Sequence, residues 1–382
     1  MRVALVAGPD PGHAFPAVAL ALRLRAAGHH PVLLTGTRWL SRVRAEGLAV
    51  RELPGLALRP GDDDADAGQR LHARSARMST ELLPLLDELG TELVVSDVLT
   101  AGGGMAAERC GLPWVELDPH PLYLPSRGLP PVGSGLAPGV GVRGRARDAL
   151  LRAMTARSLR QGARHRAAAR RAVGLAPTDP GPAARLVATM PALEVDRPDW
   201  PSTAHLVGLL AWDPARIDLI PPRGDAPLVL LSESTALGGT EGLLRAALDG
   251  LSGTRLVCTT LDGDTTLTDL PSWAALGPGR QAPLLAQARV TVCGGGHGML
   301  AKSLAAGVPA VVVPGGGDQW ELAQRAARRG CAVVVRPLTA TALAAAVHQV
   351  LDEPRFAASA RAAAATAGRV RNPVEVCAAA AR

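Results

Sequence analysis

The 382-residue sequence predicts an α/β protein with two doubly wound domains, each built on a parallel sheet. The chain is longer than one hydrophobic core usually spans. Each half opens with a short aliphatic run that leads into a turn, and a proline-punctuated polar stretch separates the halves. We expect domains at 1–211 and 228–354, a linker at 212–227, and a C-terminal helix at 355–382.

Composition narrows the class of protein. Hydrophobic residues make up 47% of the chain and charged residues 20%, as in an ordinary globular protein. The formal net charge is +7, but aromatic residues are only 2% and no recognition module is present, so we expect no nucleic-acid partner. The five cysteines are far apart and form no C-x-x-C pair, which predicts free thiols in a reducing compartment. No apolar run reaches membrane-spanning length, and the expected location is cytoplasmic.

The first structural unit is a buried strand at 2–7, a turn that holds Gly12, His13 and Pro16, and a helix that ends at Gly28. A second parallel strand follows at 32–34. His13 therefore lies at the crevice beyond the strand ends, where doubly wound sheets bind ligands. Its imidazole is either a cap on the helix or a general base that titrates near neutral pH.

A carboxylate follows the strand at 93–96. Asp97 precedes a glycine-rich turn and a helix, so it is either the N-cap of that helix or the partner that orients His13. The acidic run Asp62, Asp63, Asp64 and Asp66 lies between glycine and proline with no strand before it, so we interpret it as a solvated loop and assign no metal.

The amino-acid composition of the chain changes within residues 123–171. A proline- and glycine-rich stretch gives way to a helical pattern rich in arginine, which is either a solvated face or a surface for anionic lipid headgroups. The arginines are Arg143, Arg145, Arg147, Arg152, Arg157, Arg160, Arg164, Arg166, Arg170 and Arg171. Strands at 186–188 and 206–207 are expected to complete this domain.

The second half carries two glycine-rich turns. A strand at 228–231 ends in hydroxyl side chains, a strand at 255–259 follows, and a strand at 290–292 opens into four glycines within 294–298. A helix at 299–306 and a strand at 310–313 come next, before a second turn that ends in Asp318 and Gln319. A turn of this kind leaves backbone N–H groups free at a helix N-terminus, which favours a bound phosphate.

The stretches VTVCGGGHGML and GVPAVVVPGGGDQWE together resemble the sugar-donor half of the nucleotide-sugar glycosyltransferases of family 1, which have the two-domain GT-B fold. The resemblance is strong over 280–335 and looser over 1–120. It implies that the two domains face one another across a cleft and that the C-terminal helix packs back across both. It also implies that the N-terminal domain binds a hydrophobic small-molecule acceptor and the C-terminal domain a UDP- or TDP-sugar, without a cofactor or a metal.

The resemblance also implies roles for individual residues. His13 would be the catalytic base, Asp97 would hold it, and Tyr123 would contact the acceptor. The sugar donor would be bound by Ser234, Thr235, Gln281, Gly294, Gly295, Gly296, His297, Gly298, Lys302, Asp318 and Gln319.

This chain departs from the family pattern at several of these positions. Gly294 stands where the family has a histidine, Met299 where it has Thr or Ser, and Arg280 where a proline precedes the glutamine. His297, on the same turn, is a candidate to replace the missing histidine. Lys302 stands where the family commonly has a glutamate, and its amine either contacts the nucleotide phosphates or extends to solvent.

The predicted function is therefore an inverting, metal-independent sugar transfer to an acceptor hydroxyl. Gly-His-x-x-Pro at Gly12 to Pro16 is also similar to the lipid-acceptor enzymes of family 28, so a lipid-linked acceptor at the membrane is one alternative. A non-catalytic helper that binds the nucleotide sugar is another, because Gly294 and Met299 remove two hydrogen-bonding groups. A dinucleotide oxidoreductase is disfavoured, since no G-x-G-x-x-G follows either first strand. Weak membrane association and a homodimer stay open.

Overall fold

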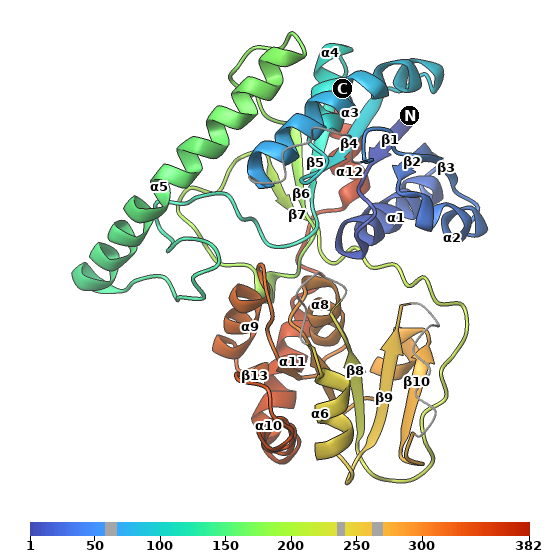
Figure 1. The fold of residues 1–382 in the computed structure, drawn as a ribbon, viewed down its shortest axis with the longest axis vertical. Helices are drawn as coiled ribbons and strands as arrows, with labels where there is room; N and C mark the ends of the chain where they lie inside the picture. Colours follow the sequence, from blue (N-terminus) through green and yellow to red (C-terminus); the bar gives the residue numbers. More distant parts are fainter. Residues whose placement is uncertain (58–66, 235–240, 262–269) are drawn as a thin grey trace.

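The computed structural model describes residues 1–57, 67–234, 241–261 and 270–382, and it places two α/β domains one above the other (Figure 1). Each domain contains one parallel sheet, as the sequence predicts. Thr235 and the acidic run Asp62 to Asp66 lie outside the described residues.

The N-terminal sheet has seven parallel strands in the order β3-β2-β1-β4-β5-β6-β7. The strand order reverses beside β1, and the loops after β1 and β4 therefore open on the same crevice. The strands are β1 (Arg2–Val6), β2 (His30–Thr35), β3 (Ala49–Glu52), β4 (Leu93–Asp97), β5 (Trp114–Asp118), β6 (Ala184–Val187) and β7 (Ala204–Leu206).

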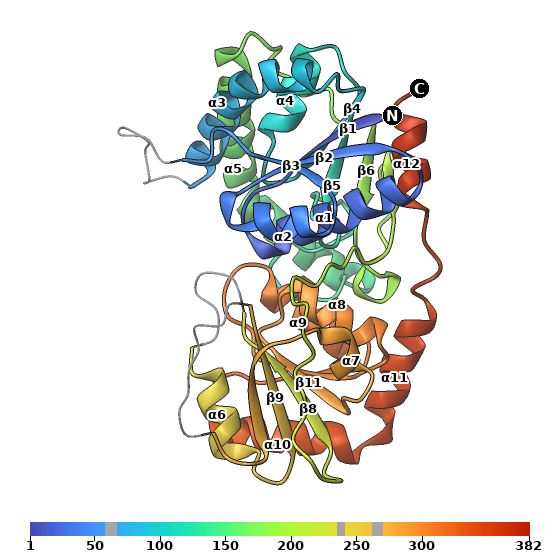
Figure 2. The same ribbon diagram turned by 90° about the vertical axis from the view of Figure 1, so that its right-hand side faces the viewer.

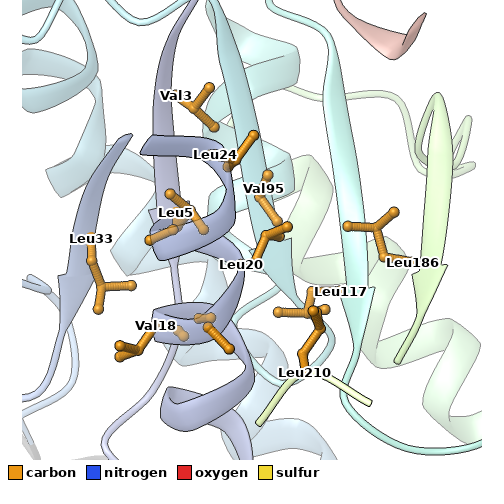
Figure 3. Packing of buried hydrophobic residues seen from close by; sticks show 14 of the residues in the cluster. Val3, Leu5, Val18, Leu20, Leu24, Leu33, Val95, Leu117, Leu186 and Leu210 are labelled. Atoms are coloured by element: carbon orange, nitrogen blue, oxygen red, sulfur yellow. The ribbon is translucent and has the colours of Figure 1, made fainter. Parts of the chain in front are cut away.

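Helix α1 (Pro11–Ala26) covers one face of this sheet. Its buried side chains Val18, Leu20 and Leu24 pack against Leu5 of β1 and Val95 of β4 (Figure 3). The helix begins before His13, so His13 and Pro16 lie in its first turns and not in the preceding loop, which corrects the predicted boundary. Pro11 at the first helical position fits this start, because its missing N–H has no intrahelical acceptor there.

The other helices of this domain are α2 (Leu40–Ala45), α3 (Ala67–Glu88), α4 (Gly102–Arg109), α5 (Gly141–Ala172) and the short 3₁₀ helices η1 (Thr37–Trp39) and η2 (Pro191–Leu193). Helix α5 contains the predicted arginine run and extends away from the sheet (Figure 1). Its C-terminal end is anchored, because the buried guanidinium of Arg170 donates two hydrogen bonds to Glu108 of α4.

The C-terminal sheet has six parallel strands in the order β10-β9-β8-β11-β12-β13. They are β8 (Leu228–Ser232), β9 (Arg255–Thr260), β10 (Ala274–Pro278), β11 (Val290–Cys293), β12 (Ala310–Val312) and β13 (Ala332–Val334). The helices are α6 (Leu243–Gly250), α7 (Gln281–Leu285), α8 (His297–Ala305), α9 (Gln319–Arg328), α10 (Ala340–Asp352), α11 (Pro354–Ala365) and α12 (Pro373–Ala380).

The C-terminal segment forms two helices and not the single helix expected for 355–382. Helix α11 packs against α8 of the C-terminal domain, whereas Val376 and Cys377 of α12 are buried in the core of the N-terminal domain. The segment between them runs from one domain to the other (Figure 2). Beside the end of β7, Arg371 N–H of this segment donates to the carbonyl of Leu206. This segment and residues 212–227 are two connections between the domains.

None of the helices in the described part of the chain is long and apolar enough to cross a membrane. All five cysteines are free, and four of them are buried.

Candidate active site

A cavity of about 510 Å³ lies between the carboxyl ends of the two sheets and is lined by both domains. Most of the predicted site residues line it. From the N-terminal domain this is His13, beside Gly12, and from the C-terminal domain they are Ser234, Gln281, Gly294, Gly296, His297, Gly298, Lys302, Asp318 and Gln319. The parallel topology explains this grouping, because the loops after parallel strands emerge at the same sheet edge.

His13 and Asp97 form a hydrogen-bonded pair at the N-terminal wall. The Nδ1 atom of His13 lies 2.9 Å from both carboxylate oxygens of Asp97. Asp97 is fully buried and also accepts a hydrogen bond from the N–H of Leu99, while the His13 side chain is 18% exposed. If Nδ1–H donates to the carboxylate, Nε2 keeps a lone pair for a substrate proton. Helix α4 begins later, with Ala101 at its N-cap, so Asp97 is not its cap.

The surroundings raise the pKa of His13. Burial is the largest influence and alone would lower this pKa, but the charge and hydrogen bond of Asp97 and the charges of Asp10 and Asp318 together outweigh it. The pair therefore stabilises the imidazolium that forms when His13 takes a proton.

The glycine-rich turn connects β11 to α8. Gly296 is the N-cap of α8 and has no side-chain cap, so the first N–H groups of the helix lack that partner. Gly295 has a φ of +82°, and a Cβ there would lie 2.7 Å from Cγ1 of Val312. This backbone therefore requires glycine. At Gly294, where the family has histidine, a Cβ would lie 3.0 Å from Cβ of Ser234, so Ser234 occupies part of the space that a side chain would need.

His297 faces the N-terminal domain. Its Nε2 lies 2.8 Å from the hydroxyl oxygen of Thr189, and its ring also hydrogen-bonds the carbonyl of Pro119. Burial lowers the pKa of His297 to about 3, so the ring is neutral and has one N–H and one lone pair. The hydrogen bonds to Thr189 and Pro119 engage both this N–H and this lone pair. The structure thus revises the prediction that the His297 side chain replaces the missing diphosphate ligand.

Ser234 and Gln319 contact each other. The amide nitrogen of Gln319 donates to the Ser234 hydroxyl at 2.9 Å, and its carbonyl oxygen accepts from the N–H of Gly315 at 2.8 Å. Gln319 is 3% exposed. Its side chain therefore links the segment after β8 to the second glycine-rich turn, and Ser234 lines the cavity.

Lys302 extends into the cavity and not to solvent. Its amine donates to Oε1 of Gln281 at 2.9 Å, and Nε2 of Gln281 donates to the hydroxyl of Thr259 at 3.1 Å. Burial lowers the pKa of Lys302, with a smaller opposing effect from the charge of Asp213. Lys302 is the single lysine of the chain, and it presents a cation at the ends of β8 and β9.

Tyr123 is placed differently from the prediction. Its hydroxyl donates to Oδ2 of Asp318 at 2.9 Å, and the ring stacks on His120, with centroids 4.3 Å apart. His120 lines the cavity, whereas Tyr123 lies behind it. Tyr123 therefore contacts the C-terminal domain and does not line the cavity.

Sequence reasoning missed several residues that form the site. His120 follows the end of β5 and lies edge-on to His13, with ring centroids 6.5 Å apart. The same rule that identified Asp97, a polar side chain just after a parallel strand, could have found it. Trp212 and Asp213 also line the cavity, although the sequence assigns them to the linker. Asp213 accepts a hydrogen bond from the N–H of Gln281 at 2.6 Å.

Asp118, at the end of β5, was also missed. It is buried, and its Oδ2 has no hydrogen-bond partner among the described residues. Burial, and then the charges of Asp97 and Glu194, raise the pKa of Asp118 to about 7.

Among the described residues, no group of three or more His, Cys, Asp or Glu side chains is placed to hold a metal ion. The predicted acidic run falls outside those residues.

Comparisons with known proteins agree with this architecture. Residues 281–381 match the family described as "Erythromycin biosynthesis protein CIII-like, C-terminal domain". The chain is 30% identical to 4'-demethylrebeccamycin synthase of Lentzea aerocolonigenes over 393 residues, which covers 93% of each protein.

Two solved structures have the same fold. The glycosyltransferase of kitacinnamycin superposes with a TM-score of 0.76 at 22% identity and covers 99% of this chain and 97% of its own. The Streptomyces sp. SF2575 glycosyltransferase SsfS6, solved with thymidine diphosphate, gives a TM-score of 0.69 at 20% identity and covers 99% of both chains. The fold is therefore GT-B.

Proposed function

Since this chain belongs to the natural-product glycosyltransferases of family 1, we propose that it transfers a sugar from a TDP- or UDP-sugar to a hydroxyl of a hydrophobic small molecule, with inversion at the anomeric carbon. The observation that carries this proposal is the His13–Asp97 pair, which faces a glycine-rich helix N-terminus across one cavity. A base on one wall and an anion site on the other are what such a transfer requires.

In the proposed reaction, Nε2 of His13 takes the proton of the acceptor hydroxyl, and the oxygen forms a bond to the anomeric carbon. The bond from that carbon to the nucleotide diphosphate breaks on the opposite face. Asp97 stabilises the imidazolium. Backbone N–H groups of Gly296 to Gly298 and the dipole of α8 stabilise the negative charge of the diphosphate without a metal ion.

The sugar-donor side is assigned from the cavity contacts. The Ser234 hydroxyl and the α8 N-terminus would hold the diphosphate, while Lys302, Gln281 and Thr259 would contact the nucleoside. Asp318 would bind sugar hydroxyls. Thymidine diphosphate in the SsfS6 structure supports testing TDP first.

Apolar side chains support a hydrophobic acceptor. Phe15, Leu210 and Leu261 line the cavity together with Trp212. Phe15 packs edge-on to Trp212, with centroids 5.1 Å apart, which gives this wall a fixed aromatic surface.

The proposal is tested by isothermal titration with TDP- and UDP-sugars, followed by turnover with a panel of phenolic and macrocyclic alcohols. The wild type is compared with His13→Ala and with His348→Ala, which changes an exposed histidine on α10. We expect binding in all three proteins, turnover only in the wild type and His348→Ala, and an inverted anomeric configuration by NMR. EDTA should leave the rate unchanged. Binding without turnover in the wild type would instead support the helper function.

A lipid-linked acceptor is a second candidate, because α5 combines arginines with exposed apolar side chains. Val142 is 77% exposed, Leu150 64% and Met154 70%, and the arginines of the helix outnumber its single acid, Asp148, which is buried. Such a helix can lie on an anionic membrane. Co-sedimentation with phosphatidylglycerol vesicles, wild type against Leu150→Glu/Met154→Glu, tests this. No binding to such vesicles would remove this candidate.

A further inference from the structure

We infer that Tyr123 is a positioning residue for the sugar-donor site: its hydroxyl fixes Asp318 across the domain boundary, so that the other carboxylate oxygen is presented to a sugar hydroxyl. This inference rests on the proposed function, because it specifies how the same cavity recognises the sugar of its donor.

The contact joins two parts of the site that are distant in the sequence. Tyr123 belongs to the loop after β5, and Asp318 precedes α9. The hydroxyl of Tyr123 donates to Oδ2 of Asp318 at 2.9 Å, and no hydrogen bond to Oδ1 of Asp318 is present among the described residues. Asp318 lines the cavity and Tyr123 does not. Tyr123 can therefore act on a bound sugar only through another residue.

The side chain of Asp318 contacts Tyr123 and does not cap its own helix. It is the N-cap of α9, a position where an aspartate normally accepts a hydrogen bond from its own helix, but its side chain caps nothing there. A carboxylate turned away from its helix and toward the opposite domain needs a partner that compensates for the lost cap. The Tyr123 hydroxyl is that partner, and burial, followed by the charge of Asp318, raises its pKa well above the ordinary value.

The ring of Tyr123 is held on the acceptor side by His120. The two rings stack with an interplanar angle of 20°, and Nδ1 of His120 lies 2.8 Å from the carbonyl of Pro121. His120 in turn lies edge-on to His13. The sugar-binding carboxylate, Tyr123, His120 and the proposed base are thus in sequential contact, which fixes the sugar relative to the base.

Removing the hydroxyl alone should not separate the domains, because further contacts hold α9 to the same loop. Trp320 donates to the carbonyl of Ser134 at 3.3 Å, Glu321 accepts from the N–H of Gly135 at 2.8 Å, and Arg328 donates to the carbonyl of Gly135 at 2.7 Å. Tyr123→Phe keeps the stacked ring and all three of these bonds. It is therefore a selective test.

The experiment measures the affinity of the full chain for TDP and for a TDP-sugar by titration. In Tyr123→Phe we expect TDP affinity to stay within about twofold and TDP-sugar affinity to fall about tenfold, as for the loss of a hydrogen bond to a charged group. Asp318→Asn should give the same pattern, and the double variant should lose little more than either single one. Trp320→Phe, which weakens the α9 contact elsewhere, should change both affinities alike.

An equal loss of TDP and TDP-sugar affinity in Tyr123→Phe, or no loss of either, would overturn the inference. If the wild type binds neither TDP nor the TDP-sugar, the proposed function itself is wrong, and the inference about Tyr123 loses the premise on which it rests. These outcomes are distinguishable in one set of titrations.

A second readout does not depend on activity. Tyr123 is the only tyrosine, so protein labelled with ¹³C-tyrosine gives a single ring signal set. Asp318→Asn should shift this signal, a TDP-sugar should shift it, and TDP alone should not. A signal insensitive to Asp318→Asn would contradict the hydrogen bond.

Discussion

Both carboxylate oxygens of Asp97 lie 2.9 Å from Nδ1 of His13; Asp97 is the last residue of β4, and His13 lies in α1, which follows the neighbouring strand β1. The pair is buried on the carboxylate side and open to the cavity on the imidazole side. The pKa of a base held in this way should appear as the midpoint of the pH dependence of the transfer rate.

Replacing Asp97 by Asn should lower the transfer rate and shift its pH dependence. The wild-type kcat/KM should rise with pH through an apparent pKa above 6.5, because His13 acts as a base only when neutral and its surroundings raise its pKa. Asp97→Asn removes the charge that contributes most to raising the pKa of His13 and replaces the carboxylate hydrogen bond, so the midpoint should move to lower pH, while the rate falls by about 10² to 10⁴. A pH–rate profile decides this; an unchanged midpoint would show that His13 is not the titrating base.

Asp118→Asn should change the pH dependence of stability. The pKa of Asp118 is raised to about 7 in the folded state, against about 4 when unfolded, so between these values the folded state binds the proton more tightly. Wild-type stability should therefore decrease as pH rises through this window, by on the order of 2–4 kcal/mol at most. Urea unfolding at pH 5 and pH 8 should show a smaller decrease for the variant.

Gly295→Ala should disturb the anion site. Its φ of +82° and the 2.7 Å approach to Val312 mean that a methyl group requires the turn to move, at a cost of roughly 1–3 kcal/mol. TDP affinity and the unfolding midpoint should both fall. Gly253→Ala is the matched control, because no atom lies within 4 Å of its added Cβ and its φ is not positive. Equal unfolding midpoints for Gly295→Ala and Gly253→Ala would contradict the backbone strain expected at residue 295.

Lys302→Met should weaken nucleotide binding about tenfold, since it removes a cation from the cavity. Because burial lowers the pKa of Lys302, its amine should lose its proton at a pH below the usual range for lysine. The TDP affinity of the wild type should fall as the pH rises through that range, and the variant should lack this dependence. Titration with TDP from pH 7 to pH 10 measures both effects. As the only lysine, Lys302 also offers a single side chain for amine-specific labelling, which bound TDP should block.

The sequence predicted the parts of this molecule that depend on local pattern. Apolar runs such as 290–292 identify buried strands, and the rule that ligands bind beyond strand ends placed His13 and Asp97 in one crevice. Contacts that depend on how the domains pack could not be predicted. His297 was assigned to the diphosphate from its place on the turn, but Thr189 of the other domain engages its ring. Tyr123 was assigned to the acceptor from the resemblance, but its hydroxyl contacts Asp318 of the other domain.

Helix α12 has a practical consequence for recombining such enzymes. The N-terminal fold is discontinuous in the gene, because its core is completed by Val376 and Cys377, which are encoded after the entire C-terminal domain. A chimera joined at a single crossover within 212–227 would pair each N-terminal core with a foreign α12. Hybrids that exchange 1–211 together with 366–382 should fold better than hybrids with one junction, and yield of soluble protein is the simplest comparison.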